Sequence, residues 1–356
     1  MKKILLFSLL LFMGINNCYA SVDTASQYIL MDMTTGRVIK GKNYNTPMLI
    51  ASITKIMTCL LAVESGKLDE VVVVDDVILE SYGSGIYIEV GEEIKLRDLL
   101  YGLMLRSGND AALMIAKYVG GDVESFVSMM NGKAKEVGMT NTIFANPSGL
   151  DNSDSGNYST AYDMALLTRY AMKYDEYREI VKTKSYTVKT NKKTYVWKNK
   201  NKLLSEDYIT GGKTGYTEKA RRTLVTTGSS DNMNFIVVTI KDSDDWNTHK
   251  DLYNYAFEEY TSYKVLNKRN FEVVGDTYYN GEFYIKNDVH LTFKKTEVGN
   301  LVGKIQLEKL EEYKNDEKVG QYLIYLDKEL LYKEDIYIKK VGKKTKGIFD
   351  YLKGII

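Results

Sequence analysis

The pattern of apolar residues changes near residue 264, and this change limits what the chain can fold into. Before that point, stretches with helical spacing alternate with strand-like stretches. After it, short alternating segments such as FEVVG, VHLTF and VGQYLIYL follow one another. A chain of 356 residues is long enough for about two domains. We therefore expect a mixed α/β (α+β) domain over residues 21–262 and a smaller β-rich domain over residues 263–338.

The first twenty residues have the features of a signal peptide. Residues 1–20 join a basic start to the apolar stretch ILLFSLLLFMGI and to the small residues Cys18 and Ala20. A retained membrane anchor and lipidation at Cys18 are the alternatives. The run is short for a spanning helix, however, and Cys18 follows an asparagine. We expect cleavage and export, after which only Cys59 would remain and no intrachain disulfide would form.

The segment 339–356 combines lysines with apolar residues at helical spacing. Val341, Ile348, Phe349 and Leu352 fall on one stripe, and most of the lysines fall elsewhere. A basic amphipathic helix of this kind lies at a membrane surface, and the segment is too short and too charged to span a bilayer. The alternative is a frayed, solvated tail. We expect this helix to hold the exported protein at the outer face of the cytoplasmic membrane.

Charge and histidine content exclude two classes of function. The chain has 48 Lys and Arg against 47 Asp and Glu, so no overall field favours nucleic acid. The only two histidines, His249 and His290, make a zinc site of histidines unexpected. We expect no metal, no cofactor and no nucleic-acid partner.

The stretch ASITKIMTCLL, residues 51–61, is typical of a buried helix but contains a serine and a lysine. Ser52 and Lys55 would share a helical face, so that hydroxyl and amine can meet. A buried ammonium group is unfavourable unless it has a partner or loses its proton. A neutral lysine is also the base that a serine nucleophile needs. Alone, such a pair is frequent by chance, and a lysine snorkelling from a partly exposed helix is the alternative.

A second motif, Ser-x-Asn, occurs three times. The three copies are Ser107-Gly108-Asn109, Ser155-Gly156-Asn157 and Ser230-Asp231-Asn232. The second lies in a polar loop and the third in a predicted hairpin turn, where these residue types are common. The first lies between two apolar helices, where a short loop would be fixed against the core. Ser107 and Asn109 are therefore the better candidates for a site.

A third motif, Lys213-Thr214-Gly215, occurs in YITGGKTGYT. Its flanking glycines suggest a strand edge that another backbone approaches closely, and an extended peptide could add to such an edge. A charged Lys213 near Ser52 would lower the pKa of Lys55. A lone copy of this motif would be a surface strand without a role, but three motifs in this order favour one shared site.

Together the motifs resemble the signature set of penicillin-binding proteins and active-site-serine β-lactamases. More narrowly, ASITKIMT, LLYGLMLRSGNDAA, TIFANPSGLD, YSTAYDMALL and GGKTGYTEKA are similar to serine D-alanyl-D-alanine carboxypeptidases of low molecular mass. The resemblance covers about residues 24–260 and implies a β-lactamase/transpeptidase-like catalytic domain. That family also has a signal peptide, a β-rich C-terminal domain and an amphipathic C-terminal anchor.

The resemblance also implies roles for single residues. Ser52 would attack the D-Ala–D-Ala bond of a peptidoglycan stem peptide, and β-lactam antibiotics would inhibit by acylating the same serine. The implied catalytic residues are Ser52, Lys55, Ser107, Asn109 and Lys213, and the implied substrate-binding residues are Thr214, Gly215, Tyr216 and Thr217. Thr214 and Thr217 would bind the terminal carboxylate. The backbone N–H groups of Ser52 and Tyr216 would form the oxyanion hole.

The sequence departs from the family pattern at two places. Ala220 is followed by Arg221 and Arg222 where relatives often have Ala-Gly, and Lys200 stands where some relatives have arginine. One of these arginines could contact a carboxylate, or both could be solvated, and we expect Arg221 to be solvated. Because a lysine lacks the bidentate fork of arginine, recognition of the terminal carboxylate is left open.

Three alternatives to a carboxypeptidase follow from the same motifs. A β-lactamase would use a Glu-x-x-x-Asn pattern, but Glu136 and Asn141 are one residue too far apart. A transpeptidase or endopeptidase would use the same site residues. An inactive cell-wall-binding protein would keep the fold without the catalysis, and the intact serine and lysines argue against it.

Overall fold

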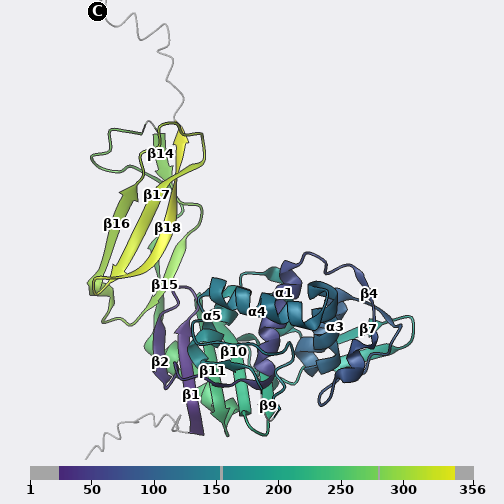
Figure 1. Ribbon diagram of the computed structural model, residues 1–356. Coiled ribbons are helices and arrows are strands. Elements are labelled where there is room, and N and C mark those ends of the chain that lie inside the picture. The colour runs from purple at the N-terminus through teal and green to yellow at the C-terminus, as the bar shows by residue number, and fades with distance from the viewer. Residues whose placement is uncertain (1–23, 153–154, 280, 341–356) are drawn as a thin grey trace, which may run out of the picture.

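The computed structural model describes residues 24–152, 155–279 and 281–340, and it mixes helices with strands as predicted (Figure 1). A five-stranded antiparallel sheet in the order β2-β1-β11-β10-β9 forms the centre of the N-terminal part. Its strands are β1 (Ala25–Asp32), β2 (Val38–Lys42), β9 (Ile209–Thr217), β10 (Arg221–Ser230) and β11 (Met233–Asp242). Strand β9 lies at the edge, so one side of its backbone is not covered by a neighbouring strand of this sheet.

Helices pack on both faces of this sheet. Alternate residues of β1 point to opposite sides, so Leu30 joins a buried cluster under α7 (Asp245–Glu259) while Ile29 joins a larger cluster on the other face. The larger cluster contains the remaining helices of the N-terminal part. They are α1 (Lys55–Glu64), α2 (Leu96–Tyr101), α3 (Asn109–Gly120), α4 (Val123–Val137), α5 (Ala161–Ala171) and α6 (Asp175–Lys182).

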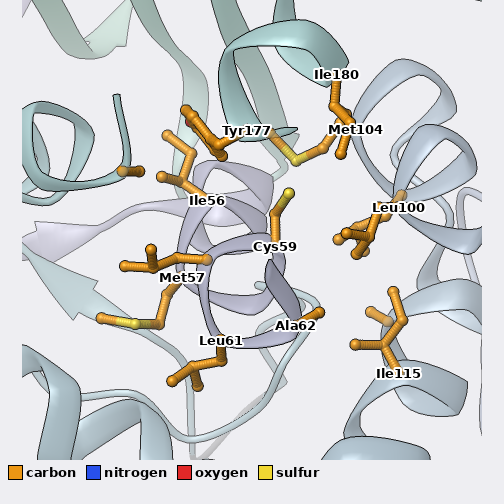
Figure 2. Close-up of a cluster of buried hydrophobic side chains, with 14 of the residues drawn as sticks. Ile56, Met57, Cys59, Leu61, Ala62, Leu100, Met104, Ile115, Tyr177 and Ile180 are labelled. Carbon is orange, nitrogen blue, oxygen red and sulfur yellow. The ribbon is translucent and has the colours of Figure 1, made fainter. Parts of the chain in front are cut away.

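Helix α1 runs through the middle of the larger cluster (Figure 2). Every residue from Lys55 to Val63 is buried, so this helix is surrounded on all sides. The labelled side chains around it come from α2, α3, α6 and a turn after α2, and they are Leu100, Ile115, Tyr177, Ile180 and Met104. Close packing of this kind fixes the position of the first residue of the helix.

The predicted break near residues 107–109 is confirmed. α2 continues into a π-helical turn, η4 (Gly102–Arg106), and the chain then turns at Ser107 with left-handed angles, φ 64° and ψ 36°. α3 begins at Asn109. The predicted helix over about 51–65 is also present, although its first turn is a 3-10 helix, η2 (Ala51–Thr54).

Shorter elements connect these helices and strands. They are β3 (Met48–Leu49) paired with β6 (Tyr158–Ser159), β4 (Val71–Val73) with β5 (Glu93–Lys95), β7 (Ser185–Lys189) with β8 (Thr194–Lys198), and the 3-10 helices η3 (Asp76–Glu80) and η5 (Lys202–Ser205).

From Thr261 onward the described chain is built of strands and one short 3-10 helix, η6 (Val298–Asn300). β12 (Thr261–Leu266) pairs with β15 (Val289–Phe293). A second five-stranded sheet has the order β13-β14-β18-β17-β16 and its own buried cluster. Its strands are β13 (Asn270–Phe271), β14 (Gly281–Tyr284), β16 (Leu301–Leu307), β17 (Glu317–Leu326) and β18 (Glu329–Lys340).

The predicted domain limits stay predictions, and both fall within strands. The limit at 262/263 lies in β12 and the limit at 338/339 lies in β18. The amphipathic helix was predicted to start at Lys339, and this start is wrong because Lys339 and Lys340 continue the pairing of β18 with β14. The rest of that helix, 341–356, and the predicted signal peptide, 1–20, lie outside the described residues. Among the residues that are described, no helix has both the length and the apolar character needed to cross a membrane.

Candidate active site

Ser52 lies in η2, the tight turn that leads into α1. The residue before it, Ala51, has a positive φ of 48°, which redirects the chain into the helix. Between residues 51 and 63, Ser52 is the one residue that is not buried. Its side chain is therefore the part of this stretch that a ligand can reach.

Lys55 is buried directly beneath Ser52. Its Nζ lies 3.2 Å from Ser52 Oγ, 2.7 Å from Asn109 Oδ1 and 2.5 Å from the carbonyl oxygen of Ser148. Ion pairs within the described ranges include neither Lys55 nor Lys213. Burial, followed by the charges of Lys213 and Lys200, lowers the pKa of Lys55 well below its usual value.

Asn109 and Ser148 are themselves held in place. The Asn109 amide nitrogen donates a hydrogen bond of 2.6 Å to the carbonyl oxygen of Tyr82, so its oxygen faces Lys55. Ser148 lies in a loop organised by Asn146, whose Oδ1 accepts from the backbone N–H of Ser148 at 3.1 Å and of Gly149 at 2.7 Å. Both oxygens that contact the lysine are therefore fixed by neighbouring chain segments.

Gly149 brings this loop against the turn that carries the serine. Its φ is +85°, and a Cβ added there would lie 1.9 Å from the carbonyl oxygen of Ala51. Only glycine permits this approach. Asn157 ties the loop to the turn from the other side, because its amide nitrogen donates to Thr54 Oγ1 at 2.9 Å and to the carbonyl oxygen of Asn146 at 2.9 Å.

Lys213 is the second buried lysine of the site. It lies on β9, and its Nζ donates to Ser107 Oγ at 3.0 Å and to the carbonyl oxygen of Thr214 at 2.6 Å. Burial and the charge of Lys200 lower the pKa of Lys213 to about 7. The left-handed backbone of Ser107 places its hydroxyl between α2 and α3, where it meets this lysine.

β9 and η2 approach each other closely at Gly215. A Cβ at Gly215 would lie 2.9 Å from the backbone nitrogen of Ser52 and 2.4 Å from Thr223 Oγ1. The glycine-flanked edge that the sequence predicted is therefore approached by a backbone, and that backbone belongs to the turn carrying Ser52.

A cleft of about 440 Å³ opens over these groups. It is lined by Ser52, Ser84, Ser107, Lys200, Thr214, Gly215, Tyr216, Arg222, Asp245 and Trp246. In this cleft, Ser52 is reachable from outside, while Lys55 and Lys213 remain buried behind it.

The structure brings together all five predicted catalytic residues, namely Ser52, Lys55, Ser107, Asn109 and Lys213. Three of the four predicted substrate-binding residues, Thr214, Gly215 and Tyr216, line the cleft. Thr217 does not line it, and its hydroxyl accepts a hydrogen bond of 3.1 Å from the backbone of Ala220.

Several residues of the site were missed by sequence reasoning. Ser148 contacts Lys55 through its backbone carbonyl oxygen, and every residue type has such a group. Asn157 was set aside because it lies in a polar stretch, and burial with four hydrogen bonds is what distinguishes it. Asp245 and Trp246, at the start of α7, gave no signal in the sequence.

Other titratable groups considered from the sequence lie apart from this cleft. Glu136 binds Lys133 and Tyr170 with its two carboxylate oxygens, at 2.7 Å and 3.1 Å. His249 is buried between Thr226 and Thr239, at 2.7 Å and 3.1 Å. Over the described ranges, no cluster of three or more His, Cys, Asp or Glu side chains is suited to hold a metal ion.

Comparison with known proteins agrees with this geometry. Residues 18–244 match the D-alanyl-D-alanine carboxypeptidase family of peptidases. The chain belongs to this family. D-alanyl-D-alanine carboxypeptidase DacF of Bacillus subtilis is 34% identical over 256 residues, which are 69% of this chain and 65% of DacF. The enzyme DacC of Escherichia coli, which has the same descriptive name, is 36% identical over 235 residues, 62% of this chain and 57% of DacC. The matched part thus spans less than two thirds of either relative.

Solved structures of relatives share the fold of this D-alanyl-D-alanine carboxypeptidase family member. Penicillin binding protein 5 of Haemophilus influenzae superposes with a TM-score of 0.71 at 25% identity, covering 89% of this chain and 97% of that one. A variant of a Streptomyces DD-transpeptidase superposes with a TM-score of 0.62 at 32% identity, covering 66% of this chain and 98% of that one. The family resemblance and the predicted β-lactamase/transpeptidase-like fold are confirmed.

Proposed function

We propose that this protein is a serine-type D-Ala–D-Ala carboxypeptidase that removes the terminal D-alanine from peptidoglycan stem pentapeptides through an acyl-enzyme at Ser52. Membership of the family and the names of the relatives support this activity. The observation that carries the proposal is the arrangement of three oxygen atoms around Lys55 Nζ.

Two of these oxygens accept the N–H groups of Lys55, and its lone pair is left for the third, that of the serine. Asn109 Oδ1 and the carbonyl oxygen of Ser148 can only accept hydrogen bonds, so each must receive an N–H from Lys55. A neutral amine has two N–H groups, and both are then used. Its lone pair is left to face Ser52 Oγ, which can donate its proton to it. Lys55 is thereby arranged as the general base for the attack of Ser52.

Lys213 and Ser107 supply the second part of the site. A charged Lys213 stabilises neutral Lys55, because two neighbouring positive charges repel each other. Lys213 also contacts Ser107 Oγ and so orients this hydroxyl, which lines the cleft. The Ser107 hydroxyl passes a proton to the leaving nitrogen. Asn109 joins the two halves of the site. It contacts Lys55, and it is the first residue of α3, two positions after Ser107.

The substrate is proposed to lie along the edge of β9. Main-chain groups of this edge strand can pair with an extended peptide. The backbone N–H groups of Ser52 and Tyr216 form the oxyanion hole, and Thr214 binds near the substrate carboxylate. Water then cleaves the ester and releases the shortened peptide. No metal or cofactor takes part in these steps. Thr217 stays a predicted contact.

Covalent labelling tests this function. Purified protein incubated with fluorescent penicillin is expected to carry one label on Ser52, identified by peptide mass spectrometry. Ser52→Ala should abolish labelling and D-alanine release while the circular dichroism spectrum stays unchanged. The exposed Ser205, in η5, provides the control, and Ser205→Ala should label at the normal rate. Labelling of Ser52→Ala at the normal rate would rule out the proposed nucleophile.

The products distinguish the alternatives that use the same residues. Likeness to a Streptomyces DD-transpeptidase makes peptide transfer the second candidate. With a pentapeptide and an added amine acceptor, loss of one alanine indicates hydrolysis and a joined product indicates transfer. Rapid turnover of penicillin would indicate a β-lactamase instead.

We also propose export and attachment to the outer face of the cytoplasmic membrane through residues 341–356. The basic and apolar composition of this segment supports the attachment. Binding to vesicles that contain anionic lipid, compared between the full chain and a chain ending at Lys340, tests it. Equal binding by both would contradict the role of the segment.

A further inference from the structure

The second five-stranded sheet has a buried face and an outer face. Neighbouring residues of a strand point to opposite sides of a sheet. Ile336 and Ile338 of β18 point into the buried cluster, so Asp335, Tyr337 and Lys339 lie on the other side. This other side of β14, β16, β17 and β18 is here called the outer face (Figure 1). Each of these strands has exposed residues on it, so the outer face is open to a partner.

The outer face carries more positive than negative charge. Two carboxylates, those of Glu282 and Asp335, lie on it. The whole chain, by contrast, has nearly equal numbers of basic and acidic residues, 48 and 47, so this face is locally basic. The exposed lysines of the outer face are Lys286, Lys304, Lys318, Lys333 and Lys339.

The carboxylates of the outer face already have partners. Asp335 forms an ion pair with Lys318 at 2.8 Å and accepts a hydrogen bond from Gln321 at 3.0 Å. Glu282 accepts a hydrogen bond from the side-chain amide of Asn270. Among the described residues, the other four lysines of this face form no ion pair. Their charge is therefore available to an anionic partner.

Two of these four lysines are held by tyrosine rings. The Nζ of Lys286 lies 3.8 Å from the ring centroid of Tyr337, and the Nζ of Lys304 lies 5.0 Å from that of Tyr325. A tyrosine ring attracts an ammonium group without cancelling its charge. Lysines that are oriented in this way lose less side-chain freedom when an anion binds, which favours binding.

The lysines are spread over the face and do not gather in a pocket. Lys304 and Lys333 lie on one cross-strand row, on either side of Leu323. Because neighbouring strands are about 4.8 Å apart, the backbones at these two lysines are about 10 Å apart. Tyr337, which holds Lys286, lies about 13 Å beyond Lys333 along β18. Charges at such intervals suit an extended polymer with repeated anionic groups better than one small ion.

The next cross-strand row has groups that can bind hydroxyls. It consists of Gln306, Gln321 and Asp335. The amides can donate and accept hydrogen bonds, and the carboxylate can accept them from the hydroxyls of a sugar. The same carboxylate would repel the phosphates of a polyphosphate or of an anionic lipid surface. A polymer that carries hydroxyls therefore fits this row better than either of these.

The row on the other side of Lys304 and Lys333 is apolar. Tyr325 pairs there with Val302 and Leu330, which are 50% and 43% exposed. A sugar ring has hydroxyls at its rim and C–H groups on its faces, so it can pack against such side chains. The outer face thus combines cations, hydroxyl-binding groups and apolar contacts, which are the groups that an acidic polysaccharide requires.

We infer that the outer face binds an acidic polysaccharide, namely the glycan strand of the cell wall that carries the stem peptides. The identity of this glycan rests on the proposed function, whereas the binding itself involves no group of the cleft. The lysines bind carboxylates along the polymer, and the flanking rows contact its hydroxyls and ring faces. Attachment of this kind keeps the cleft close to further stem peptides of the same strand.

Glycan strands freed of their peptides test this inference. Enzymatic removal of the stem peptides leaves a free carboxylate on alternate sugars and removes every bond that Ser52 is proposed to attack. Binding of the full chain to end-labelled strands is measured by fluorescence anisotropy, and it should weaken as the salt concentration rises. Lys304→Glu and Lys333→Glu should each weaken it about fivefold to tenfold, because each replaces an attraction by a repulsion. Lys333→Arg should bind like the wild type.

The matched control is Lys295→Glu. Lys295 is an exposed lysine between β15 and η6, away from the outer face, so this variant should bind the strands like the wild type. Penicillin acylation should be the same in all these variants, since none of the changed residues lines the cleft.

Several outcomes would overturn the inference. One is unchanged binding in both charge reversals, and another is an equal loss in Lys295→Glu. Equal affinity for inorganic polyphosphate would mean that any polyanion suffices. Loss of binding to anionic lipid vesicles, with glycan binding unchanged, would assign the outer face to the membrane. Penicillin labelling without glycan binding overturns this inference alone, and glycan binding without labelling overturns only the proposed function.

Discussion

At the scale of single residues, the site depends on two buried lysines that lie near each other. Lys55 has its pKa lowered by burial and by Lys213, and Lys213 has its own pKa lowered to about 7 by burial and Lys200. Two positive charges in one buried space repel each other strongly, so the site favours one charged lysine and one neutral lysine. Catalysis needs that proton on Lys213, with Lys55 neutral and facing Ser52.

The rate of penicillin acylation should therefore have two pH limbs. It should rise with pH as Lys55 becomes neutral, because the base must be unprotonated. It should fall as pH passes about 7, because Lys213 then loses its charge. Lys200→Gln should move both limbs to higher pH, since the charge of Lys200 lowers the pKa of both lysines. The control is Lys202→Gln, because Lys202 is exposed on η5 and does not line the cleft. Stopped-flow fluorescence measures the rates. Limbs that do not move in Lys200→Gln would contradict this electrostatic coupling.

The repeated Ser-x-Asn motif offers a matched pair of variants. Ser107 Oγ contacts Lys213 inside the site, whereas Ser230 lies at an exposed turn and contacts its neighbour Asp231 at 3.3 Å. Ser107→Ala should slow acylation by roughly 10²-fold to 10³-fold, as expected for loss of a proton-relaying group. Ser230→Ala should acylate like the wild type. Equal rates in the two variants would show that Ser107 has no part in proton transfer.

Residue types predicted the side chains around the nucleophile, and the backbone group of the site was hidden from them. The spacing of Ser52 and Lys55, and the second cation at Lys213, could be deduced because a hydroxyl and a buried amine need each other. The carbonyl oxygen of Ser148 could not, since every residue has one and only the fold aims it at Lys55.

At the scale of elements, the site is held by the contact between η2 and the loop 146–150. Thr58 Oγ1 of α1 donates to the carbonyl oxygen of Pro147 at 2.6 Å, and Asn157 bridges the loop to Thr54. The loop therefore sits on the first two turns of the helix that carries Lys55. Its backbone position sets the distance between Ser148 and the lysine.

Gly149→Ala should displace this loop. The added Cβ would lie 1.9 Å from the Ala51 carbonyl oxygen and overlap it. The alanine would also have to adopt a φ of +85°. Gly138 is a matched control, because its φ is +89° with nothing within 4 Å of an added Cβ. Gly138→Ala should lower the free energy of unfolding by about 1–2 kcal/mol and leave acylation unchanged. Gly149→Ala should lower it further and slow acylation at least tenfold, as measured by urea unfolding and penicillin labelling. Equal losses in both would mean that the close approach has no consequence.

Element types were predictable where a pattern extends over several turns. The helix over about 51–65 and the strands after 264 follow from periodicity. The 3-10 start of that helix was not predictable, because four residues do not distinguish a period of 3.0 from 3.6. The continuation of β18 to Lys340 depends on pairing with β14, which is a contact distant in sequence.

At the scale of the whole molecule, the turn between β1 and β2 contacts the C-terminal part at β15 and at Glu297. Figure 1 shows β2 beside β15. Arg37, which directly precedes β2, donates to the carbonyl oxygen of Thr292 in β15. Its guanidinium binds both carboxylate oxygens of Glu297, at 2.8 Å and 3.2 Å, and the carbonyl oxygen of Thr292 at 3.1 Å. It also lies near the rings of Tyr260 and Phe293, at 5.6 Å and 5.8 Å. The change of sequence pattern predicted two parts, but nothing in it predicted this link.

Arg37→Ala should uncouple the two parts of the molecule. A bidentate, largely buried ion pair with a further backbone contact is worth about 1–3 kcal/mol, and that energy joins the C-terminal part to the catalytic part. We expect urea unfolding, followed by tryptophan fluorescence and circular dichroism together, to separate into two transitions, with faster proteolysis near residues 259–266. Penicillin acylation should stay at the wild-type rate, since Arg37 does not line the cleft. Arg97→Ala is the control, because Arg97 pairs at 3.2 Å with a carboxylate that is 77% exposed, and its loss should leave a single transition. One unshifted transition in Arg37→Ala would mean that other contacts, such as Lys294 with Glu259 of α7 at 3.1 Å, hold the two parts together without Arg37.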